Sequence, residues 1–250
     1  AQSCREAMTD LGLGSGRVAF DDLRFGQQLG MEDVDVLDGY DPMMYARCVK
    51  TDVEIELLKR ATTVNEEAIC KSINAWGPGM LWQEFNHEYH KAVVELGGFV
   101  RDPGAMVWGN PCGGDPAVTL HSRLDDFVME PGMNILFDCH GTIDLYCWDG
   151  GKTWVVDGEL KGDAKQYANA TAAAATAVME AMRPGIRISE LQRVGRAVYR
   201  TSGIAGADDV LIFFHGLGLS HMELEQLGVD GVPNHDWQLE ANMVVPLHIL

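Results

Sequence analysis

The sequence has few basic residues: 19 lysines and arginines stand against 37 aspartates and glutamates, and the formal net charge is −18 at pH 7. Nucleic acids and anionic membranes are bound through basic surfaces, so this charge argues against both as partners. The sequence also lacks an apolar run of the roughly 18 residues that a membrane-spanning helix needs. Residues 1–15 show no basic and then apolar pattern of a secretory signal. We therefore expect a cytoplasmic protein that binds neither nucleic acid nor a membrane.

Paired cysteine motifs are absent as well. The six cysteines, at positions 4, 48, 70, 112, 139 and 147, form no Cys-x-x-Cys pair and no spacing of a small disulfide-rich scaffold. Reduced thiols are the default for such a set. Cys139 and Cys147 lie near acidic residues, but neither has a base beside it in sequence, so we expect both to be small buried side chains rather than metal ligands or nucleophiles.

The length of 250 residues, 46% of them apolar, is enough to bury a sizeable core in one large domain or two small ones. Helix-like and strand-like patterns alternate, which predicts the mixed α/β class. Residues 1–45 combine a short helix at 4–11 with short strands at 17–20 and 34–41, the last ending in a turn. We expect 1–45 to be the tail of a truncated N-terminal α/β domain and 46–250 to be the main domain.

Helical periodicity is strongest in four segments: 50–72, 81–96, 161–182 and 188–202. Asp52 is expected to cap the first of them, with Glu54 and Glu56 in the first turn, where the helix dipole favours negative charge. Apolar runs at 107–109, 117–120, 211–214 and 243–250 are typical of strands. Because the last run has no turn or cap after it and the chain begins as abruptly, we expect a piece of a longer protein, cut at both ends.

The stretch 134–154 predicts an antiparallel hairpin, because two β-prone runs flank a connection at 140–142 that contains a glycine. Asp138 and Asp149 have a spacing that can bring two carboxylates opposite each other, with Cβ atoms ~5 Å apart. Two anions that close repel unless a positive charge lies between them. Hard divalent cations take oxygen ligands. The hairpin therefore leaves two interpretations open, a metal site or two turn or surface aspartates, and the apolar residues around both aspartates weigh against the second.

Histidines and aspartates recur at the ends of the predicted strands, in the order His121, Asp138, Asp149, His215 and His248. In this order the chain resembles the pita-bread superfamily, which includes methionine aminopeptidase, aminopeptidase P, prolidase and creatinase. The resemblance covers roughly 50–250. The stretches that carry it are KTDVEIELLKRA (50–61), His121 with PGMNILFD ending at Asp138, the Asp138-x10-Asp149 pair followed by Lys152-Thr153, HGLGLSH (215–221) and LEANMVV (239–245).

The resemblance implies a pita-bread α/β fold, a curved antiparallel sheet covered by helices. Residues 46–250 would be the catalytic domain, truncated at its C-terminus. Asp138 would bind one metal ion and Asp149 would bridge two, with His215 as the imidazole ligand. The ions would be Mn, Co, Fe or Zn, one or two in number.

Two histidines would act on the substrate if the resemblance holds. His121 would line the pocket and donate to the substrate carbonyl or leaving group. His221 resembles the second pocket histidine, although it follows His215 by six residues where the family commonly has seven. Lys152 stands where the family usually has arginine, a mild departure. His87, His90 and His140 match nothing, and we expect them to be surface or hairpin residues.

A larger departure concerns the last strand. His248 stands where the family has a glutamate ligand, and the last glutamate of the family pattern would lie beyond Leu250. Imidazole ligates Zn, Fe, Mn or Co, but it is neutral and does not bridge as a carboxylate does. We therefore expect a metal set of Asp138, Asp149, His215 and His248.

The function implied is a metal-dependent hydrolase resembling Xaa-Pro aminopeptidase or prolidase, in which a metal-activated water attacks an amide carbonyl of a small peptide. One alternative is a non-peptidase enzyme that resembles creatinase, ectoine hydrolase or dimethylsulfoniopropionate-cleaving members and acts on a small charged molecule. A second is an inactive pita-bread binding module, against which the retained aspartates and histidines argue. A homodimer is also expected.

Overall fold

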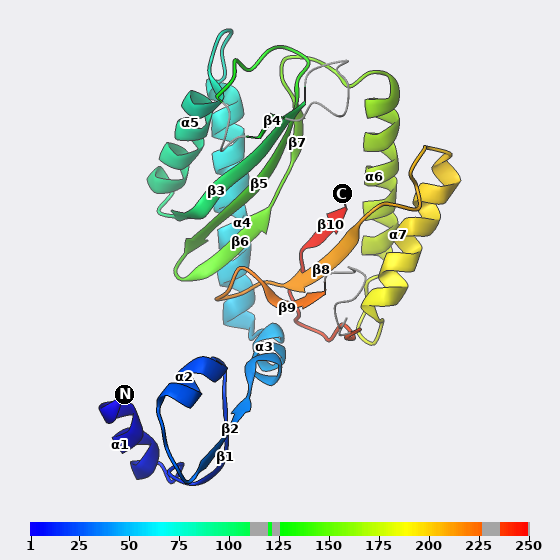
Figure 1. Ribbon diagram of the computed structural model, residues 1–250. Helices are drawn as coiled ribbons and strands as arrows, with labels where there is room; N and C mark the ends of the chain where they lie inside the picture. The colour runs from blue at the N-terminus through cyan, green and yellow to red at the C-terminus, as the bar shows by residue number, and fades with distance from the viewer. Residues whose placement is uncertain (111–119, 122–125, 227–235, 250) are drawn as a thin grey trace. The chain divides into compact units, whose positions relative to one another are not determined.

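The computed structural model describes residues 1–110, 120–121, 126–226 and 236–249, with the backbone alone at 102–110, 120–121 and 225–226. The chain divides into two compact units, Ala1–Val49 and Lys50–Leu250. Helices and strands occur in both, so the fold is of the mixed α/β class that the sequence predicts (Figure 1). None of the described helices is both long enough and apolar enough to cross a membrane.

The first unit pairs β1 (Gly16–Phe20) with β2 (Val34–Asp38) in parallel. Its helices are α1 (Gln2–Asp10), α2 (Leu23–Gln28) and α3 (Tyr40–Cys48). The sequence predicts α1 and both strands to within a few residues, misses α2, and expects a turn where α3 begins. Pro42 lies in the first turn of α3, where a missing N–H costs nothing, so the chain enters a helix there.

The larger sheet of Lys50–Leu250 has the strand order β4-β3-β5-β6, with β7 also paired to β5, and all its pairs are antiparallel. The strands are β3 (Phe99–Asn110), β4 (Leu120–His121), β5 (Asn134–Ile143), β6 (Tyr146–Gly150) and β7 (Thr153–Val155). Two helices, α4 (Asp52–Ala75) and α5 (Trp82–Glu95), lie against this sheet (Figure 1). The main core forms between them, where the ring of Phe85 packs on those of Phe137 and Trp154.

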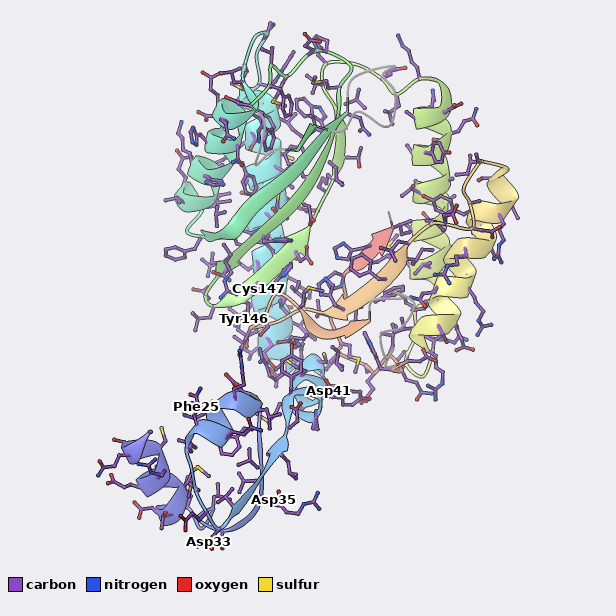
Figure 2. All side chains as sticks on the ribbon, viewed as in Figure 1. Phe25, Asp33, Asp35, Asp41, Tyr146 and Cys147 are labelled. Carbon is purple, nitrogen blue, oxygen red and sulfur yellow. The ribbon has the colours of Figure 1, made fainter. Side chains whose placement is uncertain are left out.

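The start of α4 differs by one residue from the prediction. Thr51, rather than Asp52, is the N-cap: its hydroxyl accepts from the N–H of Glu54, and the Glu54 carboxylate accepts from the N–H of Thr51. This capping box satisfies two donors that a helix end otherwise leaves unpaired. Tyr146 and Cys147 begin β6 near this helix (Figure 2), and the Tyr146 hydroxyl donates to Glu54 at 3.1 Å.

The smaller sheet has β8 (Ile212–Gly216) between β10 (Leu247–Ile249) and β9 (Glu223–Gln226), all antiparallel. Helices α6 (Gly162–Ala181) and α7 (Ile188–Ser202) pack against each other beside it. The last strand is shorter than the predicted 243–250. Pro246 has no N–H for a strand ladder and Asn242 has a φ of 68°, so regular pairing begins only after both.

The β5–β6 connection does not lie at 140–142 as predicted. Strand β5 continues through that segment, and the turn residues are Asp144 and Leu145, with φ of 50° and 72°. A two-residue turn with positive φ at both positions matches the right-handed twist of the flanking strands. The hairpin connection is therefore shorter and further along the chain than the glycine suggested.

This turn sets the register of the hairpin, in which His140 lies directly opposite Asp149. The predicted facing pair of Asp138 and Asp149 is therefore wrong. Gly141 helps to fix the register, because a Cβ there would lie 2.0 Å from the ring of Trp148. Since side chains two apart share a face of a strand, Asp138 and His140 both point toward the face that carries Asp149.

Candidate metal centre

A pocket of about 460 Å³ is lined by residues of β5, β6, β8 and β10. Backbone hydrogen bonds join the segments around it. The N–H of Cys147 donates to the carbonyl of Gly218 at 2.8 Å. The N–H of Leu217 donates to the carbonyl of Val244 at 3.1 Å. The segment 215–221 is thus tied on one side to β6 and on the other to the chain that leads into β10.

The carboxylate of Asp149 is the centre of this pocket, and its side chain is only 1% exposed. Four imidazoles surround it through their Nε2 atoms. The distances to Oδ2 are 2.8 Å from His215, 3.1 Å from His221 and 3.4 Å from His248, and the distance to Oδ1 is 3.3 Å from His140. Three of the four expected metal ligands, Asp149, His215 and His248, are therefore brought together.

Two of these imidazoles have a fixed orientation. Nδ1 of His215 lies 2.9 Å from the carbonyl oxygen of Gly216 and can only donate to it. Nε2 of His215 then faces Asp149 and is the ring nitrogen left to bind a metal ion, the arrangement of a metal-ligating histidine. His248 pairs across the strands with Phe213 and stacks on its ring, with centroids 4.4 Å apart.

His140 is the residue that the sequence failed to single out. It is buried, and its Nε2 lies 3.3 Å from Oδ1 of Asp138 and 3.3 Å from Oδ1 of Asp149. Asp138 meets the cluster through His140 and belongs to neither of the two groups of donor atoms that lie within 4.8 Å of one another. The period of two along β5 would have indicated His140, since it shares the face of Asp138.

The charges of the cluster are strongly coupled. Burial favours the neutral form of Asp149, but the four imidazoles around it outweigh burial and hold the pKa of Asp149 far below its ordinary value. Burial also disfavours the charged form of His140, but the carboxylates of Asp138 and Asp149 prevail and raise the pKa of His140 to about 9. A buried carboxylate surrounded by imidazole nitrogens, which can act as metal ligands, is an electrostatic environment that favours a bound cation.

The donor atoms fit a divalent transition metal. Oδ2 of Asp149 and the Nε2 atoms of His215 and His248 form a triangle with edges of 2.8, 3.1 and 3.4 Å. In a tetrahedral site with bonds of about 2.0–2.1 Å, donor atoms lie about 3.3 Å apart. Among the described residues, neither oxygen of Asp149 has a hydrogen-bonding partner of good geometry, and nor does Nε2 of His221. These buried polar atoms are satisfied if they ligate an ion.

The raised pKa of His140 predicts how the metal-stripped protein responds to pH. The pKa of His140 moves from 6.5 to about 9, so the folded state holds this proton more tightly than the unfolded chain does. The stabilisation is complete below pH 6.5 and is lost as the pH rises through about 9. Urea unfolding of the stripped protein across that range should show this loss, and the variant His140→Gln should show less of it. An equal loss in both proteins would contradict the assignment.

Three more histidines for which the sequence suggests a place are His87, His90 and His121. The backbone of His121 pairs with Trp108 of β3, but its side chain lies outside the described part of the chain. His87 and His90 lie on α5 and do not line the pocket. Lys152 does line it, and its amine binds Oε1 of Glu66 at 3.0 Å.

Comparison with known proteins gives a consistent result. Residues 56–249 match the model of metallopeptidase family M24. The Xaa-Pro dipeptidase of Pongo abelii is 24% identical over 195 residues, a match that covers 74% of this chain and 39% of the relative. A probable Xaa-Pro aminopeptidase of Coccidioides posadasii is 25% identical over 207 residues, covering 76% of this chain and 43% of the relative. The chain thus spans less than half the length of these two relatives.

Solved structures share the fold at low identity. The X-Pro aminopeptidase from Thermotoga maritima superposes with a TM-score of 0.73 at 21% identity, over 97% of this chain and 67% of the other. The prolidase from Pyrococcus furiosus gives a TM-score of 0.70 at 19% identity, over 92% of this chain and 66% of the other. These likenesses establish the architecture and leave the chemistry to the residues of the pocket.

Proposed function

The chain belongs to metallopeptidase family M24 and has its pita-bread fold, and on this premise we propose that it is a metal-dependent hydrolase acting on small peptides of the Xaa-Pro type. One observation carries the proposal: the Nε2 atoms of His215 and His248 converge with Oδ2 of Asp149 inside a pocket. The names of its relatives, an Xaa-Pro dipeptidase and a probable Xaa-Pro aminopeptidase, support the substrate class.

In this proposal Asp149, His215 and His248 hold a divalent ion, and Mn, Co, Fe and Zn all suit such donors. A bound ion of this kind polarises a carbonyl and lowers the pKa of a coordinated water. Asp138, whose side chain is 29% exposed, is available to accept a proton from the attacking water and return it to the leaving amine. His121 is proposed to donate to the substrate carbonyl.

His221 has two possible roles. It is the most exposed of the four imidazoles, with 31% of its side chain accessible, which suits a donor that meets the substrate. Its Nε2 also lies 3.1 Å from Oδ2 of Asp149, which suits a ligand. Elemental analysis of metal-loaded His221→Ala separates the two roles, because loss of a ligand lowers the metal content and loss of a donor to the substrate does not.

The pocket suits a dipeptide in size and lining. Small-molecule sites commonly enclose roughly 300–1,000 Å³, and this one measures about 460 Å³. The apolar side chains among its lining residues are those of Phe213, Met222, Leu247 and Ala175. An apolar ring such as proline can pack on these side chains, while the acidic residues favour a free amine nearby.

A second candidate function is hydrolysis or lysis of a C–N or C–S bond in a small charged molecule. The observation that favours it is His248, which stands where the family pattern has a glutamate. A neutral imidazole gives the ligand set less negative charge, so the ions are held less tightly and chemistry that depends less on two ions is favoured. Assays of the metal-loaded protein on an Xaa-Pro dipeptide, the matching Xaa-Ala dipeptide and a panel of small cationic molecules decide between the two. Turnover of the panel alone would replace the peptidase proposal. No turnover by a metal-loaded protein would favour a binding module.

Substitutions of His248 test whether it ligates the ion. His248→Glu adds a negative charge and an oxygen donor, so affinity for Mn²⁺ should rise about tenfold while affinity for Zn²⁺ changes less. His248→Ala should weaken both. Metal titration of the stripped wild type and the two variants measures this. Identical titrations would mean that His248 does not touch the ion and that the correspondence of the last strand with the family is wrong.

A further inference from the structure

We propose that Asn65 of α4 and Tyr89 of α5 are positioning residues for the carboxylate of Asp149, which they hold through the two residues beside it in β6. The inference rests on the proposed function only for Asp149 as a metal ligand. Neither Asn65 nor Tyr89 is among the described residues that line the pocket, so both act through the strand and not on the substrate.

The neighbours of Asp149 connect the pocket to the core behind it. Successive side chains of a strand point to opposite faces of the sheet. Asp149 lines the pocket, whereas Trp148 lies in the core that α4 and α5 form on the other face (Figure 1). A displacement of Trp148 or Gly150 therefore moves the carboxylate between them.

One chain of hydrogen bonds holds both neighbours. Nε1 of Trp148 donates to the hydroxyl of Tyr89 at 3.2 Å, and that hydroxyl donates to Oδ1 of Asn65 at 2.8 Å. Nδ2 of Asn65 then donates to the carbonyl of Gly150 at 3.3 Å. The chain thus starts at the residue before Asp149 and ends at the residue after it.

The chain is buried, so water does not replace its bonds. Trp148 and Tyr89 are each 1% exposed and Asn65 is 4% exposed. Burial raises the pKa of Tyr89 above its ordinary value, so the phenol keeps its proton and remains a donor. Apolar side chains would fill the same space without the cost of burying polar groups. The network therefore points to a role in placing the strand as well as in packing the core.

Two glycines fix the indole ring from the other side. A Cβ at Gly141 of β5 would lie 2.0 Å from the ring of Trp148, and a Cβ at Gly98, just before β3, would lie 2.9 Å from it. The ring occupies space that only glycine leaves open at these two positions. Its single N–H is thereby directed to the hydroxyl of Tyr89.

The site has a narrow tolerance for such a displacement. Oδ2 of Asp149 lies 2.8 Å from Nε2 of His215 and 3.4 Å from Nε2 of His248. Distances from a metal ion to its ligands are defined to within about 0.2 Å, so a small shift of β6 weakens the bond to Asp149. Partners that orient a metal ligand typically contribute about 10–100-fold to metal affinity or activity.

The test is Co²⁺ binding by the full chain, stripped with a chelator and reloaded, because the visible absorption of Co²⁺ depends on the geometry of its ligands. Tyr89→Phe, which removes one hydroxyl and keeps the ring, and Asn65→Ala should each lower Co²⁺ affinity about tenfold and shift the absorption bands. Because the two residues act in one chain, the double variant should lose less affinity than the product of the two single losses.

Two substitutions on α4 are the matched controls. Ser72→Ala removes a buried hydroxyl that donates to the carbonyl of Ala68, and Ile69→Ala removes only apolar atoms from the same core. Both should keep the Co²⁺ affinity and spectrum of the wild type, although Ile69→Ala lowers the urea midpoint. A purely structural role predicts the same for Tyr89→Phe. An unchanged affinity and spectrum in Tyr89→Phe would therefore overturn the proposal.

Kinetics supply a second readout if the metal-loaded wild type cleaves an Xaa-Pro dipeptide. At saturating metal, Tyr89→Phe should lower kcat about tenfold with little change in KM, because the placement of the ion is disturbed and the contacts to the substrate are kept. A wild type that binds Co²⁺ but cleaves no peptide would disprove the proposed function, and the Co²⁺ affinities would still decide this inference. A wild type that binds no Co²⁺ would overturn both.

Discussion

Replacement of Asp149 by alanine should leave the protein without bound divalent metal and lower kcat/KM for an Xaa-Pro dipeptide at least ~100-fold. The carboxylate is 1% exposed, and all four imidazoles of the cluster lie within 3.4 Å of its oxygens. Without it, the proposed site loses its central anion, and only imidazoles are left around the doubly charged ion. Elemental analysis of the purified variant measures the metal, and initial rates at saturating zinc measure the activity.

The control separates this effect from general damage to the protein. Asp163→Ala removes an exposed aspartate from the first turn of α6 and should keep the wild-type metal content. Asp149→Asn keeps the size of the side chain and removes the charge, so it should bind metal almost as poorly as the alanine variant. Unchanged metal content in either Asp149 variant would end the assignment of a metal site.

The long helices were predictable because their signal is local. Apolar residues at helical spacing and glycine or proline after the last turn located α4, α5, α6 and α7 to within a few residues. The short helices α2 and α3 were missed because each presents too few turns for a periodicity to emerge. The shortened β10 was also missed, although Pro246 was visible as an obstacle to strand pairing.

The candidate site was predictable in part. Asp149, His215 and His248 were selected by the order and spacing of motifs, and the structure brings them together. His140 was not selected, because its role depends on the register of the hairpin. That register follows from a turn at Asp144 and Leu145, further along the chain than the glycine at 141 suggested.

A second feature of the fold had no sequence signal at all. Lys50 and Glu223 are 173 positions apart, and their side chains form an ion pair of 2.7 Å with both partners 1% exposed. Nothing in either local sequence indicates that these charges are buried. The pair connects the start of α4 to the segment that carries His221. Glu223 binds Lys50 through Oε2, and its Oε1 accepts from the N–H of Ser220, the residue before His221.

Replacement of either partner of this pair should destabilise the protein strongly. Lys50→Met or Glu223→Gln leaves the remaining group buried without its counter-charge, which typically costs about 3–5 kcal/mol. Lys59→Met is the matched control, because Lys59 pairs with Glu56 at the same 2.7 Å but with both side chains well exposed. An exposed pair contributes at most about 1 kcal/mol, so this variant should unfold close to the wild type.

Urea unfolding measures the difference in the free energy of unfolding between these variants. It appears as a shift of the urea midpoint if the dependence of that free energy on urea concentration has the same slope in each variant. The loss should also reach the site, because Ser220 precedes His221 and is held by Glu223. Glu223→Gln should therefore also lower kcat/KM for an Xaa-Pro dipeptide, because it loosens the segment that carries His221, while Lys59→Met should leave kcat/KM unchanged. Equal urea midpoints for Lys50→Met and Lys59→Met would mean that burial does not increase the contribution of the Lys50–Glu223 pair to the free energy of unfolding. In that case the segment of His221 must be held in place by its backbone hydrogen bonds to β6 and to the chain before β10.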